Sequence, residues 1–188
     1  MTQKLPDEHI ILDYLHREDK YAQQAMSWIV DAYAKRLYTT IRRWAKNHEL
    51  TNDILQETLL KIWKNRTQFQ GNSSLYSWIF RIAYNETLQA LKKEKKHLAT
   101  EIDAPIVSFH HHSEHFGKIS AEEISSWLME ALDQLPEKQR LVFEMKYFED
   151  LKYEEIATIT GGSTGGLKAN YFHAVNKIET FLKSKLNH

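Results

Sequence analysis

Two stretches of this sequence combine the side chains that contact nucleic acids. The first covers residues 69–96 and reads FQGNSSLYSWIFRIAYNETLQALKKEKK, which is aromatic and basic. The second covers residues 153–178 and reads YEEIATITGGSTGGLKANYFHAVNKI, a pattern typical of a helix-turn-helix. Because both lie on one short chain, we expect a protein that touches DNA at two places.

The first stretch places aromatic rings beside cations, a combination that suits unstacked bases and backbone phosphates. Its rings and charges are Tyr76, Trp78, Arg81, Tyr84, Lys92, Lys93, Lys95 and Lys96. The amide of Asn85 can pair with a base edge, and the loop FQGNSS can form a pocket for one flipped base. A packed core explains many of the rings equally well, and we favour it for Phe80 and Tyr84, which share a helical stripe with Leu88.

The second stretch predicts two helices and a turn. Gly161 and Gly162 supply the turn, and Ser163 is placed to cap the helix that follows. The apolar stripe of that helix consists of Leu167, Tyr171, Ala174, Ile178 and Leu182. At about 100° per residue, the opposite side carries Lys168, Ala169, Phe172, His173 and Asn176. Lys168 suits a guanine or a phosphate and Phe172 a thymine methyl, although the spacing alone is equally compatible with an ordinary helical hairpin.

The elements around these stretches are predicted to be almost entirely helical. The chain has 188 residues with only 6 glycines and 3 prolines, and its apolar residues recur at spacings of three or four. One long stripe consists of Ala22, Met26, Ile29, Tyr33, Leu37, Ile41 and Trp44. A second consists of Leu55, Leu59, Ile62 and Trp63, and a third helix is expected from about Leu75 to Lys95. The fold class is therefore all-α.

The helical periodicity disappears between His97 and about Ser120. This segment holds Pro105, Gly117 and four histidines, and it reads as a flexible linker. The histidines are His110, His111, His112 and His115. We therefore expect two small helical domains, residues 1–96 and 123–188, joined by a linker over residues 97–122. The second domain contains the helix-turn-helix, and an apolar stripe in front of it is interrupted at Pro136.

Bulk composition excludes several classes of protein. Lysine plus arginine equal aspartate plus glutamate at 25 each, so affinity for a polyanion has to come from local patches. Cysteine is absent, which excludes disulfides and thiolate sites and fits a reducing compartment. No long apolar run and no signal-peptide pattern is present, so we expect a soluble, cytoplasmic protein.

The order of the motifs resembles one family. The chain resembles the extracytoplasmic-function class of bacterial RNA polymerase sigma factors. The resemblance is carried by four motifs in order: DILQETLLKIWKN, FQGNSSLYSWIFRIAYN and, after a linker, LPEKQRLVFEMKYFEDLKYEEIATITGGS and GLK. The resemblance covers nearly the whole chain apart from the linker. It implies an amino-terminal domain that binds the clamp coiled coil of RNA polymerase and helps to melt the minus-ten promoter element. The carboxyl-terminal domain would read the minus-thirty-five element.

The resemblance also implies which residues make each contact. Those that face the polymerase are Asp53, Gln56, Glu57 and Lys61. Those at the minus-ten element are Phe69, Gly71, Asn72, Ser73, Ser74, Arg81, Asn85, Lys92 and Lys93, and Phe69, the loop and Asn85 would form the pocket for a flipped base. Those at the minus-thirty-five element are Ser163, Thr164, Lys168, Ala169, Phe172 and His173. The implied partners are core RNA polymerase, the duplex upstream element, the non-template single strand and, as often in the family, an anti-sigma factor; no cofactor is implied.

The recognition helix departs from the family's pattern. Arginines are common there in family members, whereas this chain has Asn170 and His173, and Gly166 stands where threonine is common. The upstream promoter sequence therefore does not follow by analogy. Fewer phosphate contacts also predict a weaker dependence of upstream binding on salt.

Three other interpretations stay open at this point. The sequence HHHSEH could bind zinc or nickel, although adjacent histidines in a linker rarely close a tetrahedral site. An enzyme would need a catalytic constellation, and neither Asp53 with Glu57 nor Glu94 with His97 is enough for one, so a non-enzyme is expected. A helix-turn-helix repressor with a sensing or dimerising front lobe is the strongest alternative, but it has no need of DILQETLLKIWKN, the serine-rich loop or Asn85.

Overall fold

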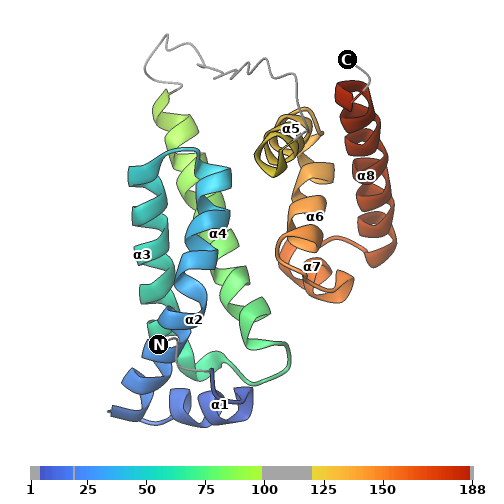
Figure 1. The fold of residues 1–188 in the computed structure, drawn as a ribbon. Coiled ribbons are helices and arrows are strands. Elements are labelled where there is room, and N and C mark those ends of the chain that lie inside the picture. Colours follow the sequence, from blue (N-terminus) through green and yellow to red (C-terminus); the bar gives the residue numbers. More distant parts are fainter. Residues whose placement is uncertain (1–4, 19, 99–119, 187–188) are drawn as a thin grey trace. The chain divides into compact units, whose positions relative to one another are not determined.

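The computed structural model of the protein describes residues 5–18, 20–98 and 120–186 (Figure 1). Over these residues it contains eight α-helices, one short 3₁₀ helix and no strand, which confirms the all-α class. The helices are α1 (Glu8–His16), α2 (Lys20–Ala45), α3 (His48–Lys64), η1 (Arg66–Gln68), α4 (Leu75–Leu98), α5 (Ala121–Asp133), α6 (Glu137–Tyr147), α7 (Tyr153–Thr160) and α8 (Thr164–Leu186). None of the described helices is long and apolar enough to cross a membrane.

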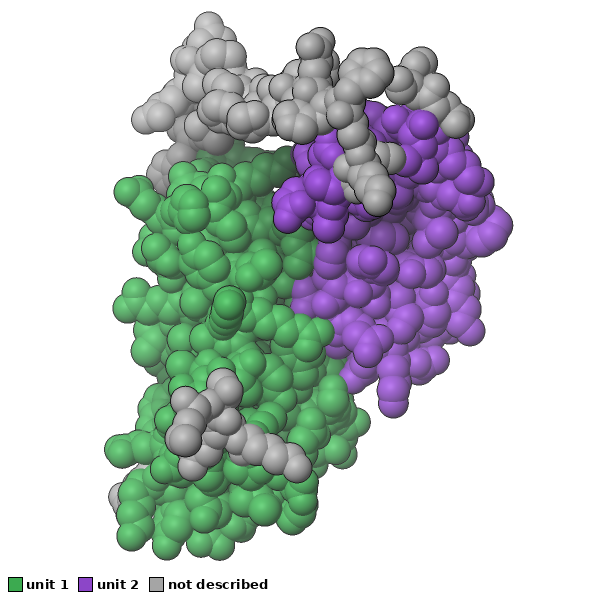
Figure 2. Space-filling view, viewed as in Figure 1, with its two compact units in different colours: residues 1–104 green, residues 105–188 purple. Residues whose placement is uncertain are grey.

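The helices fall into two compact units, residues 1–104 and 105–188 (Figure 2). Unit 1 contains α1 to α4 with η1, and unit 2 contains α5 to α8. Two small helical domains, the second with a helix-turn-helix, are what the sequence predicts. Of the linker predicted over residues 97–122, the part with the four histidines lies outside the described residues, whereas its ends are helical, because α4 extends to Leu98 and α5 begins at Ala121.

The core of unit 1 is centred on α2, which packs against α1, α3 and α4. The stripe predicted for α2 faces inward, and its residues Leu37 and Ile41 are at most 1% exposed. The ring of Trp44 lies 5.8 Å, centroid to centroid, from both Phe80 and Tyr84 of α4. Phe80 therefore belongs to the core, and Tyr84 is half-buried against it, as expected. Helix α1 is an addition to the elements predicted from the sequence.

The buried face of α3 is shifted from the predicted stripe, and the two sets share only Ile62. Its buried residues are Thr51, Ile54, Thr58 and Ile62, whereas Leu55, Leu59 and Trp63 are half-buried. Threonine is tolerated in the core because its hydroxyl bonds a carbonyl one turn back, and Thr58 Oγ1 donates to Ile54 O at 2.7 Å. The prediction counted only large apolar residues and was wrong here for that reason.

The core of unit 2 forms around α8, which packs against α5, α6 and α7. Its buried members are Ala131, Leu132, Leu135, Phe143, Ala174 and Ile178. Helix α5 begins in a capping box, in which Ser120 Oγ accepts from the Glu123 N–H and the Glu123 carboxylate accepts from the Ser120 N–H. Pro136 stands between α5 and α6 as the N-cap of α6, so the interruption predicted there is confirmed.

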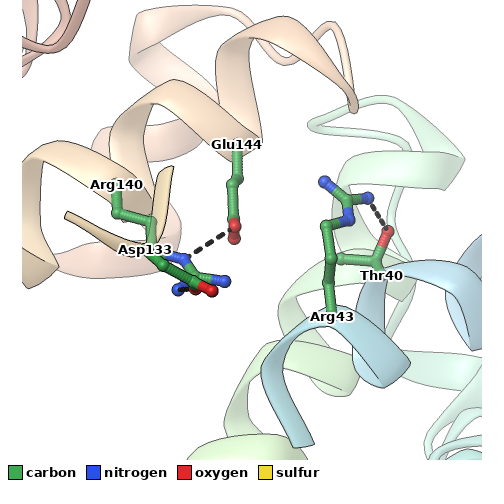
Figure 3. Close-up of polar contacts among 5 residues, drawn as sticks. All are labelled: Thr40, Arg43, Asp133, Arg140 and Glu144. Atoms are coloured by element: carbon green, nitrogen blue, oxygen red, sulfur yellow. Dashed lines mark hydrogen bonds and ion pairs between the residues drawn. The ribbon is translucent and has the colours of Figure 1, made fainter. Parts of the chain in front are cut away.

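A network of ion pairs joins α5 and α6 in unit 2 (Figure 3). Arg140 donates through Nε to Glu144 Oε1 at 2.9 Å and through Nη1 to Asp133 Oδ1 at 2.6 Å. The Glu144 side chain is only 1% exposed. Burial disfavours the charge of Arg140, but the Glu144 and Asp133 carboxylates outweigh it and raise the pKa of the guanidinium. The network therefore fixes α6 against the end of α5.

Candidate nucleic-acid interface

The loop between η1 and α4 is held at both ends. The ring of Phe69 at its start is 2% exposed and lies 5.3 Å, centroid to centroid, from that of Trp78. At its end, Ser74 Oγ accepts from the Ser77 N–H at 3.2 Å and caps α4. Phe69 and Ser74, both predicted to contact DNA, thus hold the loop in place. Residues 70–73 between them are exposed.

Two hydrogen bonds from α1 also reach this loop. His16 Nε2 donates to the Phe69 carbonyl at 2.8 Å, and Glu8 Oε1 accepts from the Leu75 N–H at 3.1 Å. Burial, followed by the charge of Glu8, raises the pKa of the nearby Tyr33 hydroxyl. The sequence analysis missed both α1 residues, because each meets a backbone group more than 50 residues away and no local pattern marks it.

One face of α4 carries the cations and the amide predicted for the single strand. Arg81, Asn85 and Lys92 are exposed and fall within about 40° of one another around the helix. Because α4 is continuous, its rise puts Asn85 about 15 Å beyond Leu75 at the end of the loop. The end of the loop and Asn85 are therefore separated along α4, and a single pocket formed by both stays a prediction.

Lys93 lies on another side of α4. It lines a groove of about 600 Å³ between α3 and α4, together with Asp53, Glu57 and Glu86. Lys61 of α3 is bound across the same two helices, with its Nζ 2.6 Å from Glu86 Oε1. The structure therefore groups Lys93, predicted to support the DNA strand, with residues predicted to face the polymerase.

The outer face of α3 is polar with one apolar side chain on it. Asp53, Gln56 and Glu57 are exposed, as a surface for a partner requires. Leu60, on the same face, is 44% exposed although it is apolar. The sequence analysis missed Leu60, and its position three or four residues after the polar pair is the signal that could have found it.

The aromatic rings of α4 are packed against other side chains. Tyr76 is 9% exposed, and the Arg36 guanidinium lies 4.1 Å from its ring centroid. Trp78 and Tyr84 are half-buried against neighbouring rings. In this part of unit 1, the groups that face solvent are therefore cations, amides and hydroxyls, with the rings beneath them.

The helix-turn-helix of unit 2 forms as predicted. Gly161 follows α7 in the left-handed conformation with φ 74°, and Ser163 Oγ accepts from the Gly166 N–H at 3.2 Å as the cap of α8. A residue with a side chain would cost about 1 kcal/mol in the conformation of Gly161. The turn that orients α8 therefore depends on this glycine and on the serine cap.

The outer face of α8 presents a cation, a ring and an imidazole. Lys168, Ala169, Phe172 and His173 are exposed, and Thr164 at the start of the helix is half-buried. Phe172 is 61% exposed although it is apolar. The predicted apolar stripe lies on the inner side, with Ala174 and Ile178 in the core. The side chains predicted for a recognition helix are therefore exposed, and their contact with base edges stays a prediction.

Two family models match separate parts of this chain. Sigma-70 region 2 matches residues 29–97, which lie in unit 1, and Sigma-70 region 4 matches residues 125–178, which lie in unit 2. Together the two matches cover more than half of the chain.

Known proteins resemble the chain over nearly its whole length. The ECF RNA polymerase sigma-E factor of Escherichia coli is 24% identical over 187 residues, with 95% of each chain covered. The RNA polymerase sigma-H factor of Pseudomonas aeruginosa is 25% identical over 184 residues, with 94% of each covered. Among solved structures, the sigma factor RpoE in complex with the anti-sigma factor NepR, from Bartonella quintana, has a TM-score of 0.68 at 24% identity and covers 88% of this chain and 98% of its own. CnrH in complex with the cytosolic domain of CnrY has a TM-score of 0.64 at 16% identity, with 93% and 96% covered.

The chain thus combines a helical unit with a second unit that contains a helix-turn-helix. The chain belongs to the sigma-70 family, in its extracytoplasmic-function class. It directs RNA polymerase to promoters, and the resemblance stated from the motifs is confirmed. Sigma factors are in general regulators of transcription without an enzymatic activity of their own.

Proposed function

We propose that unit 1 of this sigma factor stabilises the open promoter by holding two different bases of the non-template strand. One base enters the loop over residues 69–74, and the other meets Asn85. The observation that carries this proposal is the separation of about 15 Å between the end of the loop and Asn85 along α4. Arg81 and Lys92 share the face of Asn85 and neutralise the phosphates of the strand that runs along it. Because only unpaired bases reach these sites, their capture favours the melted state.

Core RNA polymerase is proposed to bind the outer face of α3. Asp53, Gln56 and Glu57 offer hydrogen-bond acceptors, and Leu60 offers an apolar contact among them. A face of this kind complements a helical partner surface that carries basic side chains around an apolar centre. Lys61 contributes by holding α3 to α4 through Glu86. This ion pair keeps the outer face of α3 beside α4, which carries Arg81, Asn85 and Lys92.

The upstream element is proposed to be read by α8 in the major groove. Lys168 lies in the second turn of the helix, where it reaches a guanine or a phosphate, and Phe172 contacts a thymine methyl one turn later. The groups at the start of α8, Ser163 and Thr164, lie next to the helix N-terminus and favour a phosphate there. Specificity of this surface therefore rests on few side chains.

We also infer an anti-sigma factor as a partner of this protein. One of the two similar structures holds its sigma factor in complex with an anti-sigma factor, and the other in complex with a cytosolic domain. The protein works in the cytoplasm, where it meets RNA polymerase. It carries out no chemical step itself, because bond formation belongs to the polymerase.

The proposal is tested by transcription in vitro with bacterial core RNA polymerase, this protein and fragmented genomic DNA, with transcript starts mapped. We expect discrete new starts. Asn85→Ala should reduce them at least about fivefold, because it removes one base contact. Gln24→Ala is the matched control, since it removes an exposed amide from α2, a helix with no proposed contact with DNA. Starts that survive Asn85→Ala as well as they survive Gln24→Ala would contradict the two-base proposal.

A further inference from the structure

One face of helix α1 contacts the loop over residues 69–74, which is proposed to hold a base of the non-template strand. Glu8, Leu12 and His16 are spaced four residues apart and so lie on one side of the helix. Glu8 bonds the backbone N–H at the end of the loop at 3.1 Å, and His16 bonds the carbonyl at its start at 2.8 Å. Between them, Leu12 Cδ2 lies 3.3 Å from the position that a Cβ on Gly71 would occupy. The loop is therefore contacted at its start, its middle and its end.

The neighbouring face of α1 is anchored in the core of unit 1. Ile11 and Leu15 are fully buried, and each directly precedes a residue that contacts the loop. One face thus fixes α1 to the unit, and the adjacent face fixes the loop to α1. A displacement of the loop has to move this anchored helix or break its contacts.

The contacts restrain the backbone of the loop and leave its side chains exposed. Both hydrogen bonds from α1 go to main-chain groups, and Gly71 is held at φ 71°. Asn72 and Ser73 remain exposed. A loop whose backbone is already fixed loses less conformational entropy when a base enters it, so more of the contact energy appears as affinity.

We propose that α1 is the positioning element of this loop, and that Glu8, Leu12 and His16 set the affinity for the captured base by acting through the loop backbone. The proposal rests on the function proposed above for residues 69–74. The match to Sigma-70 region 2 does not contain it, because that match begins at residue 29 and α1 ends at His16.

The test uses the complete complex of this protein with core RNA polymerase. Its affinity is measured for single-stranded non-template oligonucleotides from a mapped promoter, in which each base in turn is replaced by an abasic site. The unmodified protein should lose affinity at two positions, one for the loop and one for Asn85. His16→Leu and Glu8→Ala should each bind the intact strand about 3- to 10-fold more weakly, the factor expected for one lost hydrogen bond. For both variants, an abasic site at the loop position should no longer lower the affinity, whereas an abasic site at the Asn85 position should still lower it.

Two further variants separate positioning from general damage. His9→Leu makes the same substitution at an exposed histidine of α1, and it should behave like the unmodified protein. His16→Gln keeps an N–H donor that reaches the Phe69 carbonyl, so it should recover most of the affinity. Circular dichroism checks the folding of each variant. Glu8→Gln keeps an acceptor of the same length, so it should keep most of the affinity that Glu8→Ala loses.

The outcomes separate this inference from the proposed function beneath it. Suppose that the unmodified protein shows an abasic effect at the loop position. If His16→Leu then binds every abasic oligonucleotide more weakly by the same factor, or binds all of them as tightly as His9→Leu does, the positioning role is overturned and the loop keeps its function. If the unmodified protein shows no abasic effect assigned to the loop, the function of the loop is overturned, and the positioning role with it.

Discussion

The two surfaces proposed to face DNA in this protein are built in different ways. In unit 1 the surface includes a loop of irregular backbone, which is bonded at both ends by α1 and anchored by the buried ring of Phe69. In unit 2 the surface is the outer face of α8, a continuous helix whose own hydrogen bonds fix its backbone. The first surface depends on elements that are far apart in the chain. The second depends on a cap, a glycine turn and an apolar stripe, all close in sequence.

The difference follows from the form of DNA that each surface meets. An unpaired base brings no fixed geometry with it, so the protein has to supply the shape of the pocket. A duplex brings a groove that is wide enough for a helix, so an exposed helix face is sufficient. We infer that substitutions remote from DNA affect strand capture in unit 1 more than they affect upstream recognition, provided that each unit stays folded.

The largest expected effect is a loss of stability in unit 2 that leaves unit 1 unchanged. Arg140→Met removes a guanidinium that bonds both Glu144 and Asp133. We expect it to destabilise unit 2 by about 3 kcal/mol, because two charge-assisted hydrogen bonds are lost. Hydrogen exchange followed peptide by peptide should show α5 to α8 losing protection while α1 to α4 keep theirs.

The control for Arg140→Met is an exposed pair in the same unit. Lys183 Nζ lies 2.6 Å from Glu179 Oε1, with both side chains more than half exposed. Lys183→Met should leave the protection of unit 2 nearly unchanged, because solvent screens such a pair. A loss of protection in unit 1 as large as that in unit 2 would mean that the two surfaces share one folding unit, and the comparison drawn above would fail.

The second effect compares two glycines with the same backbone conformation, one in each unit. The φ angles are 71° at Gly71 and 74° at Gly161, so alanine costs about 1 kcal/mol of strain at either position. A Cβ on Gly71 would in addition meet Leu12 of α1 at 3.3 Å, whereas one on Gly161 would meet nothing within 4 Å. Gly71→Ala should therefore weaken non-template strand binding about tenfold, an effect of about 1.4 kcal/mol.

Gly161→Ala should leave strand binding unchanged, although it lowers the thermal stability of unit 2. The measurement is the affinity of the complex with core polymerase for a single-stranded oligonucleotide. If both variants weaken that affinity alike, the effect of Gly71→Ala reflects a general loss of stability, and the shape of the loop is not what matters.

The sequence alone was sufficient for elements whose signal is local and periodic. The helix-turn-helix is one case, because the glycine turn, the cap of Ser163 and the stripe of α8 lie within one short segment. The inward stripe of α2 is another. The order of the motifs also sufficed for the family.

The sequence was insufficient where the role of a residue depends on a distant partner. The resemblance implied that Phe69 forms part of the pocket for a flipped base, and its burial beside Trp78 could not be predicted from the sequence. Lys93 continues a basic run, yet the winding of α4 turns it toward the groove with α3. The contacts of Glu8 and His16 with the loop are invisible in the sequence, because they join a helix to the backbone of a segment more than 50 residues away.

The smallest expected effect tests whether a glycine in unit 2 serves the fold or the DNA. Gly165 lies in the first turn of α8, and a Cβ there would meet nothing within 4 Å. Gly165→Ala should therefore stabilise unit 2 by about 0.5–1 kcal/mol, because alanine has the higher helix propensity. Thermal unfolding measures this gain.

The same substitution should weaken upstream recognition. At 100° per residue, position 165 falls within about 60° of Lys168 and so on the outer face of α8. An added methyl group there separates the first turn from the phosphate backbone, and we expect duplex affinity to fall about threefold through a lengthened backbone hydrogen bond. Stability and DNA binding would then change in opposite directions, whereas Gly71→Ala lowers both in unit 1. If fluorescence anisotropy shows unchanged duplex affinity, the upstream surface binds DNA through side chains alone. The backbone would then matter for DNA binding in unit 1 and not in unit 2.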